Sequence, residues 1–131
     1  MNFLIVEDDL SGVMLLQKIL YEYGKIDYVA DGNDAIEAFN RAWANGNPYD
    51  LIFLDIMMPS MNGQQVLSMI RKKEMEMRIP QIKEVKVIIT SALDSIDSVS
   101  KAFNEGRAFA YLVKPILKNQ VLEQINKIRI V

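Results

Sequence analysis

Residues 49–63, YDLIFLDIMMPSMNG, decide the fold of this chain. Within them, residues 51–54 are four consecutive apolar residues, the pattern of a short strand buried on both faces of a parallel sheet. Asp55 follows directly, so it should lie at the carboxyl end of that strand, where open α/β sheets bind their ligands. Pro59 then predicts a loop, and Asn62 can cap the helix that follows.

The same order of strand, polar end and helix recurs along the chain. Short apolar or alternating runs predict four further strands, and apolar residues spaced by three and four predict a helix after each strand. These strands are expected at residues 3–6, 25–30, 85–89 and 108–113. Five strands that alternate with helices predict a doubly wound parallel sheet, with helices on both faces joined by right-handed crossovers.

Capping and turn residues mark where the predicted helices begin and end. Asp31 precedes the second helix, Asp94 or Ser95 can cap the fourth, and Gly106 ends the fourth. Residues 71–78, RKKEMEMR, carry mixed charge and are interpreted as a solvated part of the third helix, which Pro80 stops.

Composition limits the possible functions. With 131 residues the chain fits one domain, and we expect neither a second domain nor an output domain. Its net charge of -2 argues against a nucleic acid partner. The chain has no Cys and no His, so thiolate and imidazole chemistry are excluded. Because no apolar run resembles a signal peptide or a membrane span, we expect a cytoplasmic protein without a membrane partner.

Polar residues at the ends of four predicted strands should converge at one edge of the sheet. They are Glu7 with Asp8, Asp55, Thr90 and Lys114. Three neighbouring carboxylates repel one another unless a cation lies among them, and oxygen ligands alone favour Mg²⁺. A carboxylate nucleophile with a metal, a lysine and a hydroxyl is a group suited to phosphoryl transfer.

Nearly the whole chain resembles the receiver domains of two-component response regulators. The matching motifs are IVEDD, LIFLDIMMPSMNG, VIITSA and YLVKP, which occur in the order and at the spacing of that family. The resemblance implies a flavodoxin-like (βα)5 fold and a central aspartate that accepts a phosphoryl group from a histidine kinase or phosphotransfer protein. It implies a signalling phosphoacceptor, whose only chemistry is its own phosphorylation and dephosphorylation, and not an enzyme.

The resemblance also implies a role for each residue that matches a family motif. Asp55 becomes the phosphoacceptor, Thr90 and Lys114 contact the phosphoryl group, and Tyr111 becomes the switch aromatic that moves inward with Thr90. The Lys114-Pro115 peptide bond becomes cis. The expected magnesium site comprises Glu7, Asp8, Asp55 and the backbone carbonyl of Met57.

The chain departs from the family pattern in two places. Residues 107–110 contain one residue more than expected, which requires a bulge or a longer loop and leaves Phe109 either in the core or exposed. Residues 72–84 are also longer than usual, and they either extend the third helix or form a loop. In addition, neither Met57 nor Ala92 can orient a water strongly, from which we hypothesise slow self-dephosphorylation.

Two functions of different classes remain open from the sequence. The first is a stand-alone receiver whose phosphorylation changes the surface seen by an unidentified output protein. The second is a receiver-like binding module that phosphate does not regulate. A phosphatase and a flavin protein are weaker alternatives, because Met57 stands where a phosphatase needs a second acid and EDDLSG is not a glycine-rich phosphate loop.

Overall fold

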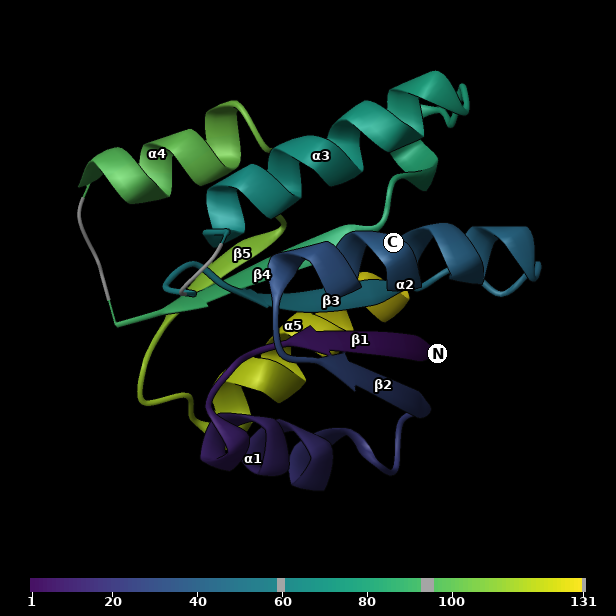
Figure 1. The fold of residues 1–131 in the computed structure, drawn as a ribbon. Coiled ribbons are helices and arrows are strands. Elements are labelled where there is room, and N and C mark those ends of the chain that lie inside the picture. The colour runs from purple at the N-terminus through teal and green to yellow at the C-terminus, as the bar shows by residue number, and fades with distance from the viewer. Residues whose placement is uncertain (59–60, 93–95, 131) are drawn as a thin grey trace.

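The computed structural model describes residues 1–58, 61–92 and 96–130. Within them, five strands alternate with five α-helices (Figure 1). The strands are β1 (Asn2–Val6), β2 (Lys25–Val29), β3 (Leu51–Asp55), β4 (Lys86–Ser91) and β5 (Ala110–Val113). The helices are α1 (Leu10–Leu20), α2 (Gly32–Ala44), α3 (Gly63–Glu76), α4 (Ile96–Asn104) and α5 (Lys118–Ile130), and a 3-10 turn, η1 (Gln81–Lys83), precedes β4.

All five strands run parallel in the order β2-β1-β3-β4-β5. This confirms the predicted doubly wound, flavodoxin-like sheet. The apolar run of β3 lies at the centre of the sheet and is wholly buried, because strands flank it on both sides and helices cover both faces. The strand order brings the carboxyl ends of β1, β3 and β4 next to one another.

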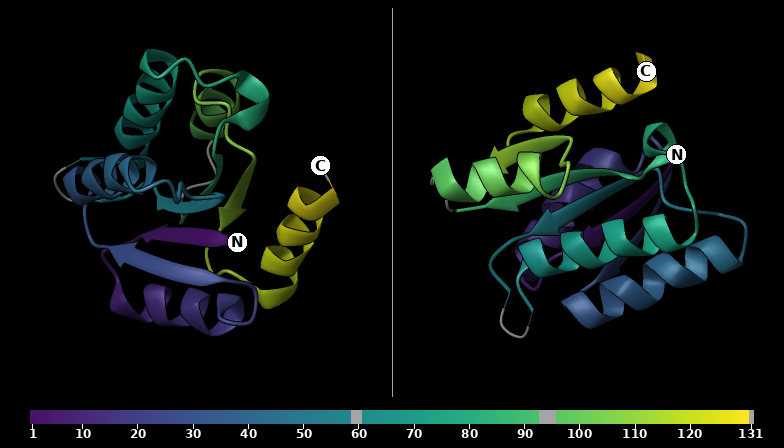
Figure 2. Two further views of the ribbon diagram at one scale, coloured as in Figure 1. Left: turned by 90° about the vertical axis from the view of Figure 1, so that its right-hand side faces the viewer. Right: turned by 90° about the horizontal axis from the view of Figure 1, so that it is seen from above.

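Helices cover the two faces of the sheet unequally (Figures 1 and 2). On one face, α1 and α5 pack side chains such as Leu16 and Ile125 around Phe53 of β3. On the other face, α2, α3 and α4 form a second core, in which Ile70 of α3 packs in one cluster with Ile52. Figure 2 shows that both chain termini lie on the side of the molecule where the strands begin.

Side-chain caps begin three of the helices. The side chain of Asp9 accepts a hydrogen bond from the Ser11 N–H at the start of α1. At the start of α2, the side chain of Asp31 accepts a hydrogen bond from the Asp34 N–H. Asn62 and Gln65 exchange hydrogen bonds in a capping box at the start of α3. The predicted caps Asp31 and Asn62 are thus confirmed. The alternative caps Asp94 and Ser95, and the loop residue Pro59, lie outside the described residues.

The charged segment at the end of α3 differs from its prediction. Arg71 and Glu74 were expected on a solvated face, but both are buried and paired at 2.5 Å. Arg71 also donates hydrogen bonds to the backbone carbonyls of Gly106, Val85 and Arg107, and the Glu74 carboxylate accepts one from the Val85 N–H. The prediction was wrong because backbone groups on two other segments complete the hydrogen bonding of this ion pair.

The structure also shows how the chain accommodates its two longer segments. α3 ends at Glu76, and η1 completes the connection to β4. Between α4 and β5, Arg107 adopts a left-handed conformation with φ of 53°, so that the extra residue lies in the loop before β5. Phe109 is half-buried against the core formed with α1 and α5. In the described part of the chain, no helix has the length and hydropathy needed to cross a membrane.

Candidate functional site

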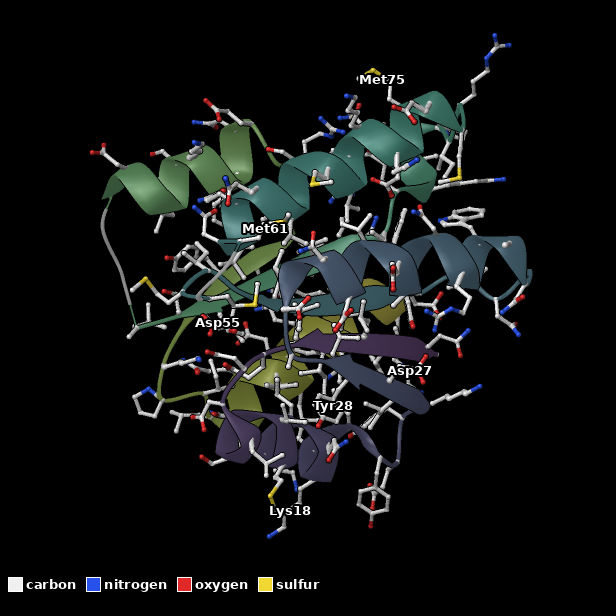
Figure 3. The ribbon with its side chains drawn as sticks, in the orientation of Figure 1. Lys18, Asp27, Tyr28, Asp55, Met61 and Met75 are labelled. Carbon is white, nitrogen blue, oxygen red and sulfur yellow. The ribbon has the colours of Figure 1, made fainter. Side chains whose placement is uncertain are left out.

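The polar residues predicted at the strand ends meet at one edge of the sheet. Asp55 is the last residue of β3 and lies opposite Thr90 of β4 in the parallel register. Glu7 directly follows β1, and Lys114 directly follows β5. Figure 3 shows Asp55 at the edge where the strands end, close to the loops that lead into the helices. Glu7, Asp55 and Thr90 are each 3% exposed, so the site is sunk into the sheet edge.

Lys114 joins the two buried acids. Its Nζ lies 2.6 Å from Glu7 Oε1 and 3.3 Å from Asp55 Oδ2. Burial and the nearby Asp55 charge raise the pKa of the Glu7 carboxyl, although the Lys114 hydrogen bond acts in the opposite direction. Burial alone would lower the pKa of Lys114, but its contacts with Glu7 and Asp55 outweigh burial and raise it. Lys114 therefore stays charged and offsets part of the negative charge.

The three acids together form a group that suits a hard cation. One carboxylate oxygen from each of Glu7, Asp8 and Asp55 lies within 4.8 Å of the others. Asp8 is exposed, which leaves the cluster open to solvent on one side. The charge of three carboxylates exceeds that of the one lysine, and oxygen ligands without His or Cys match Mg²⁺ or a similar ion.

Local backbone geometry holds Asp55 in place. The Met57 N–H donates a 3.0 Å hydrogen bond to Asp55 Oδ1. Gly63, the first residue of α3, lies so close to the end of β3 that a Cβ there would come within 2.5 Å of the Asp55 carbonyl oxygen. A glycine at position 63 is thus required by close packing of α3 on β3, a role that the sequence analysis did not assign. The sequence signal for it is the glycine directly after the helix cap Asn62.

The remaining predicted residues surround the acids. Thr90 and Lys114 line, with Glu7, a hollow of about 220 Å³ between α1 and the β5-α5 loop. Tyr111 is half-buried on β5, opposite Ile89 of β4. The Lys114-Pro115 peptide bond is cis, as the resemblance implied. Asp9 caps α1 and is absent from the acid cluster.

Comparison with known proteins assigns the family. Residues 3–126 match the family model described as the response regulator receiver domain. This chain is a response regulator receiver domain. The match covers nearly the whole chain, so the receiver accounts for all five strands and for every residue of the candidate site.

Proteins similar in sequence to this receiver include kinases and transcriptional regulators. The receiver is 35% identical over 125 residues to hybrid signal transduction histidine kinase L of Dictyostelium discoideum, covering 95% of this chain and 7% of that protein. It is 33% identical over 126 residues to transcriptional regulatory protein HprR of Escherichia coli, covering 95% and 50%. The chain thus spans half or less of the length of these relatives.

Solved structures share the fold. A crystal structure of a CheX-CheY-BeF3-Mg²⁺ complex from Borrelia burgdorferi contains a chain that is 30% identical, with a TM-score of 0.82 and coverage of 98% of this receiver and 88% of that chain. A CheY-like receiver from Methanospirillum hungatei, 24% identical with a TM-score of 0.78, covers 96% of this receiver and 90% of its own chain. That second similarity supports the fold alone.

Membership of the family defines the class of function. Receiver domains belong to two-component signalling systems, pair with histidine kinases, and act as phosphoacceptors and not as enzymes. This receiver carries the acidic pocket of Glu7, Asp8 and Asp55 that a phosphoacceptor with a bound cation requires. The fold, the family and the acidic pocket therefore agree with the sequence analysis.

Proposed function

We propose that this receiver accepts a phosphoryl group on Asp55 in a Mg²⁺-dependent reaction and thereby changes the surface that it presents to an output protein. The observation that carries the proposal is the position of Asp55, buried at the end of the central strand with Lys114 Nζ 3.3 Å from its carboxylate. A carboxylate at this position is held near a fixed cation and remains accessible through the exposed side of the acid cluster.

The residues of the site divide the chemistry among them. A carboxylate oxygen of Asp55 attacks the phosphorus of the donor, a new phosphorus–oxygen bond forms, and the bond to the donor's leaving group breaks with its electron pair. Lys114 neutralises charge on the phosphoryl oxygens, and Thr90 donates its hydroxyl to one of them. Glu7 and Asp8, with Asp55 and the Met57 carbonyl, would hold Mg²⁺, which supplies the second positive charge when bound.

The proposed switch involves Thr90 and Tyr111. Both residues lie on adjacent strands, β4 and β5, whose register places Thr90 opposite Leu112, the residue after Tyr111. Movement of Thr90 toward a phosphoryl group would change the packing near Tyr111, which is half-buried against the core under α2, α3 and α4. The surface formed by α4, β5 and α5 would then differ between the two states, which an output protein could distinguish.

The phosphoryl donor is proposed to be a histidine kinase or a phosphotransfer protein. The chain itself contains no His, so the donor imidazole must come from another protein. Support comes from the family match and from the similar CheX-CheY complex of Borrelia burgdorferi, which contains BeF3 and Mg²⁺. We likewise propose a cytoplasmic location and an output protein that distinguishes the two states.

The proposal is tested by intact-mass measurement after incubation with acetyl phosphate. We expect one added phosphoryl group when Mg²⁺ is present and none with a chelator. Asp55→Asn should abolish the adduct, because an amide oxygen is a poor nucleophile, whereas Asp34→Asn, at an exposed position in α2, should not.

The opposite result would favour the binding module that phosphate does not regulate. That result is an absent adduct together with no Mg²⁺ binding, measured by calorimetric titration of the folded protein. An adduct that survives in Asp55→Asn would instead place the phosphoryl group on a different residue.

A further inference from the structure

A second hollow lies at the opposite edge of the sheet, where the strands begin. It measures about 620 Å³, and its lining includes residues that directly precede β1, β3 and β4. Apolar side chains make up much of it, from Met1, Trp43, Pro48, Ile82 and Ile128. We call this the amino-edge hollow. None of the residues of the phosphoacceptor site lines it.

Ile82 is the most exposed large apolar residue in the described chain, with 81% of its surface accessible. It lies on η1, whose ends are held by hydrogen bonds from the Lys83 N–H to the Pro80 carbonyl and from the Glu84 N–H to the Gln81 carbonyl. η1 is therefore a hydrogen-bonded turn at the edge of the hollow.

Two ion pairs, of which Arg71–Glu74 is buried and Glu84–Arg107 half-buried, hold the residues that follow η1. Glu84 pairs with Arg107, and the next residue, Val85, is held through both its N–H and its carbonyl by Glu74 and Arg71. An exposed isoleucine is thus presented on a rigid support and not on a mobile loop. Exposing a large apolar side chain costs free energy, and a rigid support lowers the entropy that a partner must remove on binding.

The charges around the hollow are mainly positive, and one of them, the Arg129 guanidinium, lies 5.7 Å from the centre of the Tyr23 ring. Lys83, Lys86 and Arg129 line it, and among the described residues neither lysine forms an ion pair. Two acids also line the hollow, and the three cations outnumber them. Asp50 accepts a 2.7 Å hydrogen bond from the Asn2 N–H, and Glu84 pairs with Arg107. The free charge is therefore complementary to carboxylates.

We infer that the amino-edge hollow is a docking site for an acidic segment of another protein, in which carboxylates flank a bulky apolar side chain. The apolar side chain would enter the hollow against Ile82 and Trp43, and the carboxylates would contact Lys83 and Lys86. This site is separate from the phosphoacceptor site at the other edge of the sheet. Docking here is consequently independent of the state of Asp55.

Trp43 makes the inference directly testable. It is the only tryptophan of the chain and is half-buried at the hollow, so its fluorescence reports on the hollow without a label. The probe is a terminally blocked peptide of repeated Glu-Glu-Leu-Leu units, titrated into the full chain. We expect a saturable blue shift that weakens as salt is raised, because the contacts include charge pairs.

Matched variants distinguish the hollow from the rest of the surface. Ile82→Asp should weaken peptide binding by about tenfold. The change removes an apolar contact that the bound peptide would bury, and it adds a negative charge that repels the glutamates of the peptide. Met75→Asp changes a residue that is 74% exposed on the outer face of α3, outside the hollow (Figure 3), and should have no effect. Lys83→Glu should likewise weaken binding, whereas Lys72→Glu on α3 should not. Asp55→Asn should bind the peptide as wild type does.

Four outcomes would overturn the inference. One is the absence of a saturable fluorescence change, and another is equal binding by Ile82→Asp and wild type. A third is equal or tighter binding of a peptide in which lysine replaces every glutamate. The fourth is tighter binding to phosphatidylglycerol vesicles than to the acidic peptide, which would identify a lipid surface as the occupant.

Discussion

Met57 gives a prediction for the rate of dephosphorylation at the phosphoacceptor site. Its backbone N–H holds Asp55, but its side chain is 57% exposed and ends in a thioether, a weak hydrogen-bond acceptor. Ala92, exposed beyond the end of β4, offers no polar group either. We therefore expect phosphorylated Asp55 to hydrolyse slowly, and Met57→Asn to shorten its lifetime several-fold by orienting a water.

The lifetime can be measured as phosphate release from the purified phosphorylated protein. Met75→Asn, at an exposed position far from Asp55 in sequence, serves as the matched control and should leave the rate unchanged. A wild-type lifetime of only seconds would contradict the expectation.

Glu84 predicts a pH dependence of stability. Hydrogen bonds from Arg107 hold the pKa of its carboxyl below the ordinary value of 4.5, despite the opposing effect of burial. A lowered folded pKa means that the contribution to stability is complete above pH 4.5 and is lost as pH falls through the folded pKa. Wild type should thus lose its stability advantage over Glu84→Gln in that acidic range.

Denaturant unfolding of both proteins, near neutral pH and at several values below 4.5, measures the difference. If the difference in unfolding free energy between wild type and Glu84→Gln stayed constant across this pH range, the ion pair would make no pH-dependent contribution to stability.

Single residues at the site were predictable because their positions follow from strand ends. An acid directly after an apolar strand must lie at the carboxyl end of that strand. The local pattern alone therefore predicted the positions of Asp55 and of the Glu7-Asp8 pair. Arg71 and Glu74 could not be found in this way. Their burial depends on carbonyl and amide groups more than ten residues away, which no local pattern reveals.

Helix α3 gives a prediction for a whole element. Arg71 links it to the start of β4 and to the α4-β5 loop through Glu74 and three backbone carbonyls. Arg71→Met leaves Glu74 buried without its partner and should destabilise the protein by about 3 to 5 kcal/mol. Lys73→Met, which breaks an exposed 3.7 Å pair with Glu76 on the same helix, should cost less than about 1 kcal/mol.

Equilibrium unfolding in urea measures both variants. Similar losses in the two would show that the buried network contributes no more than a surface ion pair. The double variant Arg71→Met with Glu74→Leu should not recover the wild-type stability, because the backbone groups of Gly106 and Val85 would remain without partners.

Elements with strong periodicity were predicted well, and their ends less so. The apolar face of α2 follows from its sequence, since Ala35, Ala38 and Phe39 are all buried. Leu10, an apolar residue at the amino-terminal end of α1, is instead 60% exposed. It is the first residue of α1, and the buried residues of that helix begin only at Val13.

For the whole molecule, the acid cluster connects cation binding to stability. Gathering Glu7, Asp8 and Asp55 within 4.8 Å is unfavourable in the folded state, and one lysine offsets it only in part. A cation that binds this folded arrangement stabilises the protein by about 1.4 kcal/mol when present at tenfold its dissociation constant. Mg²⁺ should therefore raise the melting temperature by a few degrees.

The measurement is thermal unfolding with Mg²⁺ and with chelator. Asp8→Asn combined with Asp55→Asn should show a much smaller Mg²⁺ effect, whereas Asp97→Asn, exposed on α4, should respond as wild type does. Equal Mg²⁺ effects in all three proteins would place the cation elsewhere.

The order of the strands was less accessible from sequence than their number. Alternating strands and helices imply a parallel sheet, but the order β2-β1-β3-β4-β5 depends on which crossovers pass in front and which behind. The resemblance to receivers supplied this information at the level of a family. Neither the local sequence pattern nor the family resemblance predicted the amino-edge hollow. Segments 43–50, 82–86 and 128–129 are far apart in the sequence and meet there only in the folded structure.

The central position of β3 also affects when the phosphoacceptor site can unfold. Its backbone N–H groups bond between two neighbouring strands under helices on both faces, so their hydrogen exchange requires the largest openings of the molecule. Asp55 is the last residue of this strand, which we expect to exchange most slowly, whereas β2 lies at the edge of the sheet and should open more readily. Local opening of the edge strands should therefore leave Asp55 in register with Thr90 until the whole domain unfolds.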